Sequence, residues 1–197
     1  MKIIGLTGGS CAGKSTVARA LHAKGAGWVD ADAVYHMLCR ENRAMLEELC
    51  TAFGDVLDAD GALDRTRLAP VVFDSPERLA LLNTITIPYI RAASQEAFAA
   101  CAACPFTLFD APTLFQSGTD DLCSGVIGVL APRALRIARI MERDGISNEQ
   151  AAARIDAQPD DRFYRARCRW IIENSASQEA VERLCGELFE ELAGVLV

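Results

Sequence analysis

The chain has 197 residues, 51% of them hydrophobic and 24% charged, so it is long and apolar enough to bury a core. The formal net charge of −7 argues against a protein that binds nucleic acid by neutralising its phosphates. No run reaches the roughly 18 apolar residues of a membrane span, and the apolar start is too short for a signal peptide. We therefore expect a soluble, cytoplasmic protein that contacts neither membranes nor nucleic acid.

The eight cysteines are best interpreted as reduced, buried thiols, because most lie in apolar, helix-like runs such as residues 98–106. The one CxxC, Cys101 to Cys104, has no second ligand pair at zinc spacing, since His22 and His36 are the only histidines. A metal-binding or redox pair is the alternative.

A strand, a glycine loop and a helix open the chain. Residues 2–7 form a short apolar run that ends in glycines, as a buried parallel strand does. From Lys14 to Lys24 apolar residues recur at helical spacing, and Gly25 and Gly27 supply a stop.

The loop between them, residues 8–15, reads Gly-Gly-Ser-Cys-Ala-Gly-Lys-Ser and matches the phosphate-binding motif G-x-x-x-x-G-K-[ST]. Its glycines let backbone N–H groups point at a polyphosphate, and the helix N-terminus adds partial positive charge. We expect Lys14 to reach the β- and γ-phosphates of ATP and Ser15 to ligate Mg²⁺. The predicted ATP-binding residues here are Gly9, Ser10, Cys11, Ala12, Gly13, Lys14, Ser15 and Thr16. GTPases, transport ATPases and kinases share the motif, so it leaves the reaction open.

Two carboxylates follow the second predicted strand. Trp28-Val29 leads into Asp30-Ala31-Asp32, and the next helix is expected to begin near Ala33. Carboxylates at the carboxyl end of a strand face the ligand crevice of an open α/β sheet. Asp32 is therefore the candidate base for an acceptor hydroxyl, with helix capping as the alternative role of the pair.

A mostly helical block follows from residue 42 to 103, broken by the turn at residues 58–61 and by prolines, and it is too long for one crossover helix. We interpret it as a helical insertion. Beta character returns at residues 106–109, which lead to Asp110. We predict that Asp110 holds Mg²⁺ through water, with the capping of a turn as the alternative.

The rest of the chain is predicted to hold two strands and three helices. Residues 125–130 form a strand, with a helix after Pro132. A capping box of Ser147 and Gln150 starts another helix that runs to about Gln158. The last strand is expected at residues 170–172, leading to Asn174, and the final helix runs from Gln178 to Val195.

Residues 133–169 contain nine arginines and six acids, a charge of +3 against −10 for the remainder of the chain. Arg136, Arg139 and Arg143 fall at i, i+3 and i+7, on one side of a helix. We predict that residues 133–158 form a lid that neutralises phosphate charge and excludes water on closing. A solvated helix face is the alternative.

Strands that alternate with helices predict one α/β domain over residues 1–197, with a doubly wound parallel sheet and right-handed crossovers. The helical insertion and the helical lid are embedded in this domain. We expect the architecture of a P-loop nucleoside-triphosphate-binding protein, similar to that of the nucleotide kinases.

The sequence resembles the dephospho-CoA kinase family of P-loop kinases over nearly its whole length. The shared pattern includes the phosphate loop, Val29–Ala33, Leu63–Arg65, Val72-Phe73, Asp110–Pro112, Arg143–Gly145 and Arg154-Ile155 with Gln158. The resemblance implies transfer of phosphate from ATP·Mg²⁺ to the ribose 3′-hydroxyl of dephospho-CoA, with these two substrates as the partners. It makes Asp32 the catalytic base and Lys14 and Arg139 the catalytic phosphate stabilisers. It also makes the helical insertion, residues 42–103, the part that binds the acceptor. It also brings Arg143 and Asn174 to ATP, Asn174 near the adenine.

Three positions depart from the family pattern: Ile87 replaces a histidine, Gln116 a glutamate and Cys168-Arg169 an Ala-Asp pair. They bear on acceptor positioning and turnover more than on the triphosphate site. A nucleoside or nucleotide kinase is one alternative. Another is a P-loop switch protein without phosphate transfer, although the chain has no Asn-Lys-x-Asp guanine signature. The sequence leaves the oligomeric state open and is compatible with a monomer.

Overall fold

The computed structural model describes residues 1–72, 75–175 and 178–194. Phe73 of the shared pattern and Val195, the expected end of the last helix, lie outside these residues. The chain divides into two compact units, Met1–Val29 with Ala100–Val197 and Asp30–Ala99. The helical insertion was expected at residues 42–103. The observed helical unit begins earlier, at Asp30, and ends at Ala99.

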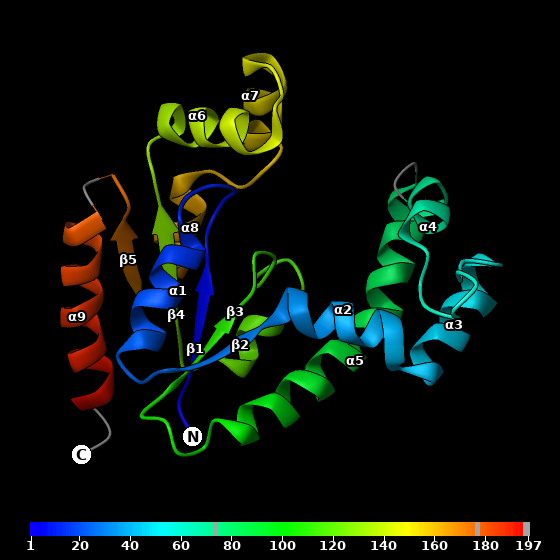
Figure 1. The fold of residues 1–197 in the computed structure, drawn as a ribbon, viewed down its shortest axis with the longest axis horizontal. Helices are drawn as coiled ribbons and strands as arrows, with labels where there is room; N and C mark the ends of the chain where they lie inside the picture. Colours follow the sequence, from blue (N-terminus) through cyan, green and yellow to red (C-terminus); the bar gives the residue numbers. More distant parts are fainter. Residues whose placement is uncertain (73–74, 176–177, 195–197) are drawn as a thin grey trace. The chain divides into compact units, whose positions relative to one another are not determined.

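The first unit is built on a parallel sheet (Figure 1). In the described residues the sheet has five strands in the order β2-β3-β1-β4-β5. Their bounds are β1 Ile3–Thr7, β2 Gly27–Asp30, β3 Thr107–Asp110, β4 Gly125–Leu130 and β5 Trp170–Glu173. The pairs β1·β3, β1·β4 and β4·β5 are parallel, and β1 and β3 are buried throughout, as their apolar runs predict. The predicted doubly wound parallel sheet is confirmed.

Helices α1 (Lys14–Ala23) and α9 (Gln178–Gly194) cover one face of this sheet. Val17 and Leu21 of α1 and Leu188 of α9 join one buried cluster with Ile4 and Leu6 of β1. Burial of such side chains stabilises the unit by roughly 1.5–3 kcal/mol each, before the entropy of ordering is subtracted. The rigid β1 and α1 therefore hold the loop between them at both of its ends.

After β4 come α6 (Arg133–Asp144), α7 (Asn148–Asp156) and α8 (Asp161–Arg167). The capping box of Ser147 and Gln150 is confirmed, and α7 ends two residues before the expected Gln158. The short α8, capped by Asp160, was not predicted, and neither was the 3₁₀ turn η1 (Thr119–Leu122). Both are too short to give a clear hydrophobic period.

The second unit is helical and contains α2 (Ala31–Glu41), α3 (Arg43–Phe53), α4 (Arg65–Val72) and α5 (Pro76–Ala100). Its own core gathers Leu38, Met45, Leu49 and Leu68. The start of α2 corrects the prediction, because the helix begins at Ala31 and not near Ala33. No helix in the described part of the chain is long and apolar enough to cross a membrane.

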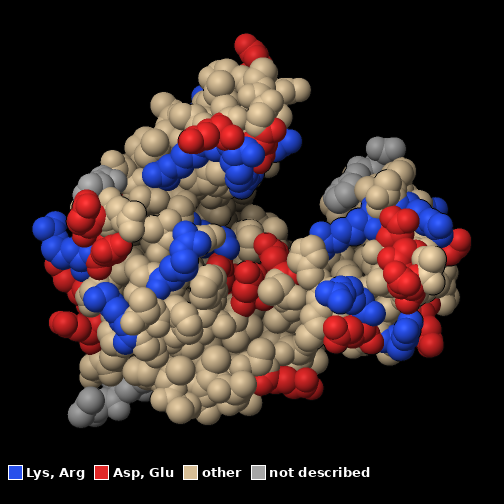
Figure 2. All heavy atoms as spheres, viewed as in Figure 1, with Lys and Arg blue, Asp and Glu red and all other residues tan. Residues whose placement is uncertain are grey.

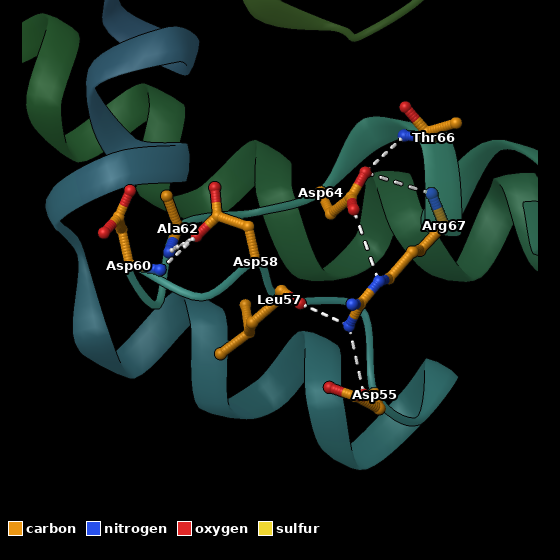
Figure 3. A network of polar contacts seen from close by, with 8 residues as sticks. All are labelled: Asp55, Leu57, Asp58, Asp60, Ala62, Asp64, Thr66 and Arg67. Atoms are coloured by element: carbon orange, nitrogen blue, oxygen red, sulfur yellow. Dashed lines mark hydrogen bonds and ion pairs between the residues drawn. The ribbon is translucent and has the colours of Figure 1, made fainter.

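The connection from α3 to α4 folds around its own carboxylates (Figure 3). Asp58 Oδ1 accepts hydrogen bonds from the backbone N–H groups of Asp60 and Ala62, at 3.0 and 2.9 Å. Gly61 has a φ of +77°, which a residue with a side chain rarely adopts. The predicted turn at residues 58–61 is therefore confirmed and locally self-supporting.

Asp64 caps the start of α4. Its Oδ1 accepts from the N–H groups of Thr66 and Arg67 at 2.8 and 3.2 Å. The guanidinium of Arg67 turns back to Asp64 and donates to the carbonyl of Leu57 and the carboxylate of Asp55 (Figure 3). One carboxylate thus fixes both the helix start and the arginine that closes the connection.

Replacing Asp64 with alanine is expected to lower the Tm at pH 7 by a pH-dependent amount. The hydrogen bond from the Arg67 N–H, followed by that from Thr66, holds the pKa of Asp64 below its ordinary value of 3.8. The stabilisation that the ionised Asp64 carboxylate provides is fully present when the pH is above the ordinary pKa. It is lost as the pH falls through the lower pKa of the folded state. In melts followed by circular dichroism, the difference in Tm between wild type and Asp64→Ala should become smaller below pH 4. Asp60→Ala is the control, and its Tm should stay close to that of wild type. A gap that is constant with pH would contradict this account.

Candidate active site

The phosphate loop lies at the carboxyl edge of the sheet, where the strand order reverses. Strands β2 and β3 lie on one side of β1, and β4 and β5 on the other. Open α/β sheets bind ligands at such a point. Gly13 is the N-cap of α1 with a φ of 99°, and no side chain caps the helix. The first N–H groups of α1 are therefore available to an anion.

Lys14, the first residue of α1, forms an ion pair with Asp110, the last residue of β3. In the register of the sheet Asp110 lies beside Leu6 of β1, so its carboxylate is next to the start of the phosphate loop. The side chains are 3% exposed for Asp110 and 17% for Lys14, and their attraction is stronger than in bulk water. Asp110 is thus the counterion of the lysine predicted to contact phosphate.

Arg139 and Asn174 approach the loop from two other elements. Arg139 of α6 donates from Nη1 to the carbonyl of Cys11 at 3.1 Å. Asn174, directly after β5 and buried, donates from Nδ2 to the carbonyl of Ala12 at 2.8 Å. Beside them lies a pocket of about 320 Å³, which Gly13, Thr16, Arg139, Asn174 and Gln178 help to line. The pocket is next to the loop and combines apolar walls with amide and guanidinium groups.

Arg143 lies in the last turn of α6 and binds Asp144 at 2.7 and 2.9 Å. Asp144 also accepts from Arg154 of α7 at 2.6 Å. The hydrogen bond raises the pKa of Arg143 and lowers the pKa of Asp144, but the two arginines are exposed, so the pairs contribute little stability. Figure 2 shows basic side chains along the edge of the α6–α7 segment. Of the three arginines predicted to form the lid surface, Arg136 and Arg139 bond the phosphate loop, and Arg143 pairs with Asp144.

The first unit brings together most of the predicted site residues. They are the phosphate-loop residues 9–16, Asp110, Arg139 and Asn174. Asp32 belongs to the second unit, in the first turn of α2, where it is exposed. The capping role that was the alternative for the Asp30 and Asp32 pair falls to Asp30, whose Oδ1 accepts from the Asp32 and Ala33 N–H groups. The carboxylate of Asp32 is not used for capping.

Sequence reasoning missed two residues that contact the loop. Arg136 was assigned to a lid surface, but it is 5% exposed and donates to the carbonyl of Ser10 at 2.9 Å. Gln158 was given no role in the site, yet its side chain bonds Ser10 as well. The burial of Arg136 could have been predicted from its position four residues before Ile140, on the apolar side of α6.

The oxygen atoms near Lys14 are suited to a magnesium ion that arrives with a nucleotide. Among the described residues no group of three or more His, Cys, Asp or Glu side chains is placed to hold a metal. Magnesium is usually held by one or two protein oxygens together with substrate phosphates and water. The Ser15 hydroxyl, in the first turn of α1, and the Asp110 carboxylate fit that pattern.

Of the three departures from the family pattern, Arg169 is remote from the phosphate loop. It precedes β5 at the amino edge of the sheet, where its guanidinium lies 4.7 Å from the ring centroid of Trp170. Ile87 is half-buried within α5 and Gln116 is exposed. The Arg169 departure therefore leaves the site around Lys14 untouched.

A family model for dephospho-CoA kinase matches residues 2–180. A dephospho-CoA kinase of Corynebacterium diphtheriae is 41% identical over 196 residues, which cover 98% of each chain. A solved structure from Thermus thermophilus matches with a TM-score of 0.82 and 37% identity, over 97% of both chains. The dephospho-CoA kinase of Campylobacter jejuni matches with a TM-score of 0.74 and 29% identity, over 100% of both chains.

Proposed function

The chain belongs to the dephospho-CoA kinase family, and from that premise we propose that Lys14, Arg139 and Asp32 transfer the γ-phosphoryl group of ATP in the active site. The reaction phosphorylates the ribose 3′-hydroxyl of dephospho-CoA and yields coenzyme A and ADP. The observation that supports this assignment best is the Lys14–Asp110 ion pair at the end of a phosphate loop. It provides a cation for the phosphates and, beside it, a carboxylate for their metal ion.

In this proposal the loop amides and the N-terminus of α1 bind the β- and γ-phosphates. Lys14 stays with the γ-phosphoryl group as charge spreads over its equatorial oxygens, and Arg139 adds a second positive charge. Asn174 and the pocket of about 320 Å³ receive the adenosine part of ATP. Arg143, at the far end of α6, belongs to the surface that covers the nucleotide.

Mg²⁺ is the divalent ion we propose for the ATP complex. The Ser15 hydroxyl would bind it directly and Asp110 through water. Once bound, it neutralises charge on the β- and γ-phosphates and so lowers the barrier to transfer. Since Asp110 also pairs with Lys14, one carboxylate would align both cations of the site.

Asp32 is the proposed base for the acceptor hydroxyl. It lies in the first turn of α2 in the helical unit Asp30–Ala99, where we place the binding of dephospho-CoA. The carboxylate accepts the proton that the 3′-hydroxyl loses as its oxygen attacks phosphorus. Holding the two reactants in line is the larger contribution of the protein to such a transfer.

We propose that this reaction takes place in the cytoplasm. All eight cysteines lie among the described residues and are free thiols. Free thiols persist in reducing compartments. A chain with eight free thiols that acts on two small-molecule substrates is therefore consistent with the reducing cytoplasm.

Replacing Asp110 with asparagine is expected to raise the Mg²⁺ concentration for half-maximal activity by roughly 10- to 100-fold, as with other second-shell metal partners. Metal-free ATP should bind the variant at least as well as wild type, because Lys14 loses its competing counterion. The two quantities are measured by kinase assays over a Mg²⁺ series and by titration of ATP in EDTA.

Asp120→Asn is the matched control, because Asp120 lies in η1, which precedes β4 at the amino edge of the sheet. It should leave both quantities unchanged. An unchanged Mg²⁺ dependence in Asp110→Asn would remove Asp110 from the metal site.

A further inference from the structure

Three successive carbonyl groups of the phosphate loop each accept a hydrogen bond from a side chain outside it. The pairs are Ser10 with Arg136 Nε at 2.9 Å, Cys11 with Arg139 Nη1 at 3.1 Å, and Ala12 with Asn174 Nδ2 at 2.8 Å. When carbonyls are held on the outside of a loop, amides of the loop can turn inward and bind an anion, although those of Ser10 and Ala12 already donate within the protein. The shape of the loop therefore depends on α6 and on the residue after β5.

Arg136 is the buried cation of this set. Its Nη2 donates to Gln158 Oε1 at 2.9 Å, and within the described chain it forms no ion pair with a carboxylate. Burial raises the pKa of Tyr164, and the positive charge of Arg136 opposes that rise. A buried charge without a counterion is costly, and the neighbouring feature built to bind an anion is the phosphate loop.

Gln158 forms the other hydrogen bonds that hold Ser10. Its Oε1 accepts from the Ser10 N–H at 2.8 Å as well as from Arg136, and its Nε2 donates to the Ser10 hydroxyl at 2.5 Å. The amide, the hydroxyl and the carbonyl of Ser10 are thus all bonded to these two side chains. A single orientation of Ser10 satisfies all of them.

The guanidinium of Arg136 occupies the space where a side chain at Gly9 would lie. A Cβ at Gly9 would lie 2.3 Å from Arg136 Nη2 and 2.8 Å from Cζ. The residue is not among the glycines with a positive φ, so its backbone does not itself demand glycine. A side chain at residue 9 would therefore have to displace the Arg136 guanidinium from its hydrogen bonds to Ser10 and Gln158.

We propose that Arg136 and Gln158 are positioning residues of the kinase, which hold Ser10 so that the loop is preformed for the phosphates of ATP. They act through Ser10 without contacting the nucleotide. This inference rests on the proposed function only in naming ATP as the ligand. Arg136 differs in this from Arg139, which also borders the pocket of about 320 Å³.

Equilibrium binding of ATP·Mg²⁺ to the full chain tests the proposal by titration calorimetry. Arg136→Met and Gln158→Leu should each raise the Kd for ATP by about 10- to 100-fold, the loss expected for a charge-assisted hydrogen bond. Because the two residues act as a unit, the double variant should be no more than about 3-fold weaker than the worse single variant. Arg136→Lys keeps the charge but not the fork of donors, so it should fall between wild type and Arg136→Met.

Arg133→Met is the matched control on the same helix, because Arg133 is exposed and pairs with Asp156. It should bind ATP as wild type does. In kinase assays Arg136→Met should raise KM for ATP and change KM for dephospho-CoA less than about 3-fold.

Three results would overturn the proposal. Wild-type ATP affinity in Gln158→Leu, or additive losses in the double variant, would mean that Arg136 acts on the phosphates directly. An equal rise in both KM values, together with a lower Tm without nucleotide, would mean a role in folding alone. If wild type binds ATP but does not phosphorylate dephospho-CoA, the proposed function is wrong. The Kd values of wild type and the variants for ATP then still test the positioning role.

Discussion

Replacing Asp32 with asparagine is expected to lower kcat for phosphorylation of dephospho-CoA by roughly 10²- to 10⁴-fold, the usual contribution of a positioned general base. Asparagine has nearly the same shape but does not accept the proton of the acceptor hydroxyl. The Kd for ATP should stay within about 3-fold of wild type, because the residues that we propose bind phosphate belong to the other unit. Steady-state kinetics with both substrates varied and calorimetric ATP binding give these values.

Asp30→Asn is the matched control for Asp32→Asn. Asparagine caps a helix about as well as aspartate, so the hydrogen bonds from the N–H groups of Asp32 and Ala33 should persist. Its kcat should stay within a few-fold of wild type. Equal losses in the two variants would show that the start of α2, and not the Asp32 carboxylate, sets the rate.

Replacing Lys14 with methionine is expected to lower kcat/KM for ATP by roughly 10²- to 10³-fold or more, the scale of losing one fixed charge-stabilising group. The variant should also have a lower Tm, because Asp110 is left as a buried carboxylate without its cation. Kinase assays and thermal melts separate the two effects only when a second variant is included.

The double variant Lys14→Met with Asp110→Asn supplies that separation. Removing the buried charge of Asp110 should restore much of the Tm while activity stays low. Activity that returns together with the Tm would show that Lys14 supports the fold and does not stabilise the transferring phosphate.

The architecture and the phosphate loop could be predicted from the sequence because local pattern determines them. The apolar run of β1, the glycines and the helical spacing after Lys14 all point to one strand, loop and helix. The position of Asp110 at the carboxyl end of a buried strand could be predicted in the same way, whereas its register beside Leu6, the last residue but one of β1, comes from the structure.

The anchors of the loop could not be predicted in the same way. Gln158 is 148 residues from Ser10 in sequence, and its contact depends on how α7 ends. Arg136 was predicted from its spacing to belong to a lid that neutralises phosphate charge, and in the structure it is buried and donates to the carbonyl of Ser10. Helical spacing gives the side of a helix but not what covers it.

The start of α2 shows a similar limit. Asp30 and Asp32 are alike in the sequence, and the sequence did not show which of the two caps the helix. The helix begins at Ala31, so Asp30 caps it and Asp32 falls in its first turn. Capping depends on where the chain leaves the strand, which the apolar pattern fixes only to within a few residues.

ADP release from ATP·Mg²⁺, measured with no acceptor and then with dephospho-CoA, adenosine or AMP, shows which acceptor the enzyme phosphorylates. We expect strong stimulation by dephospho-CoA alone, together with a product phosphorylated at the ribose 3′-hydroxyl. Equal stimulation by AMP or adenosine, or ATP binding without stimulation by any acceptor, would contradict it.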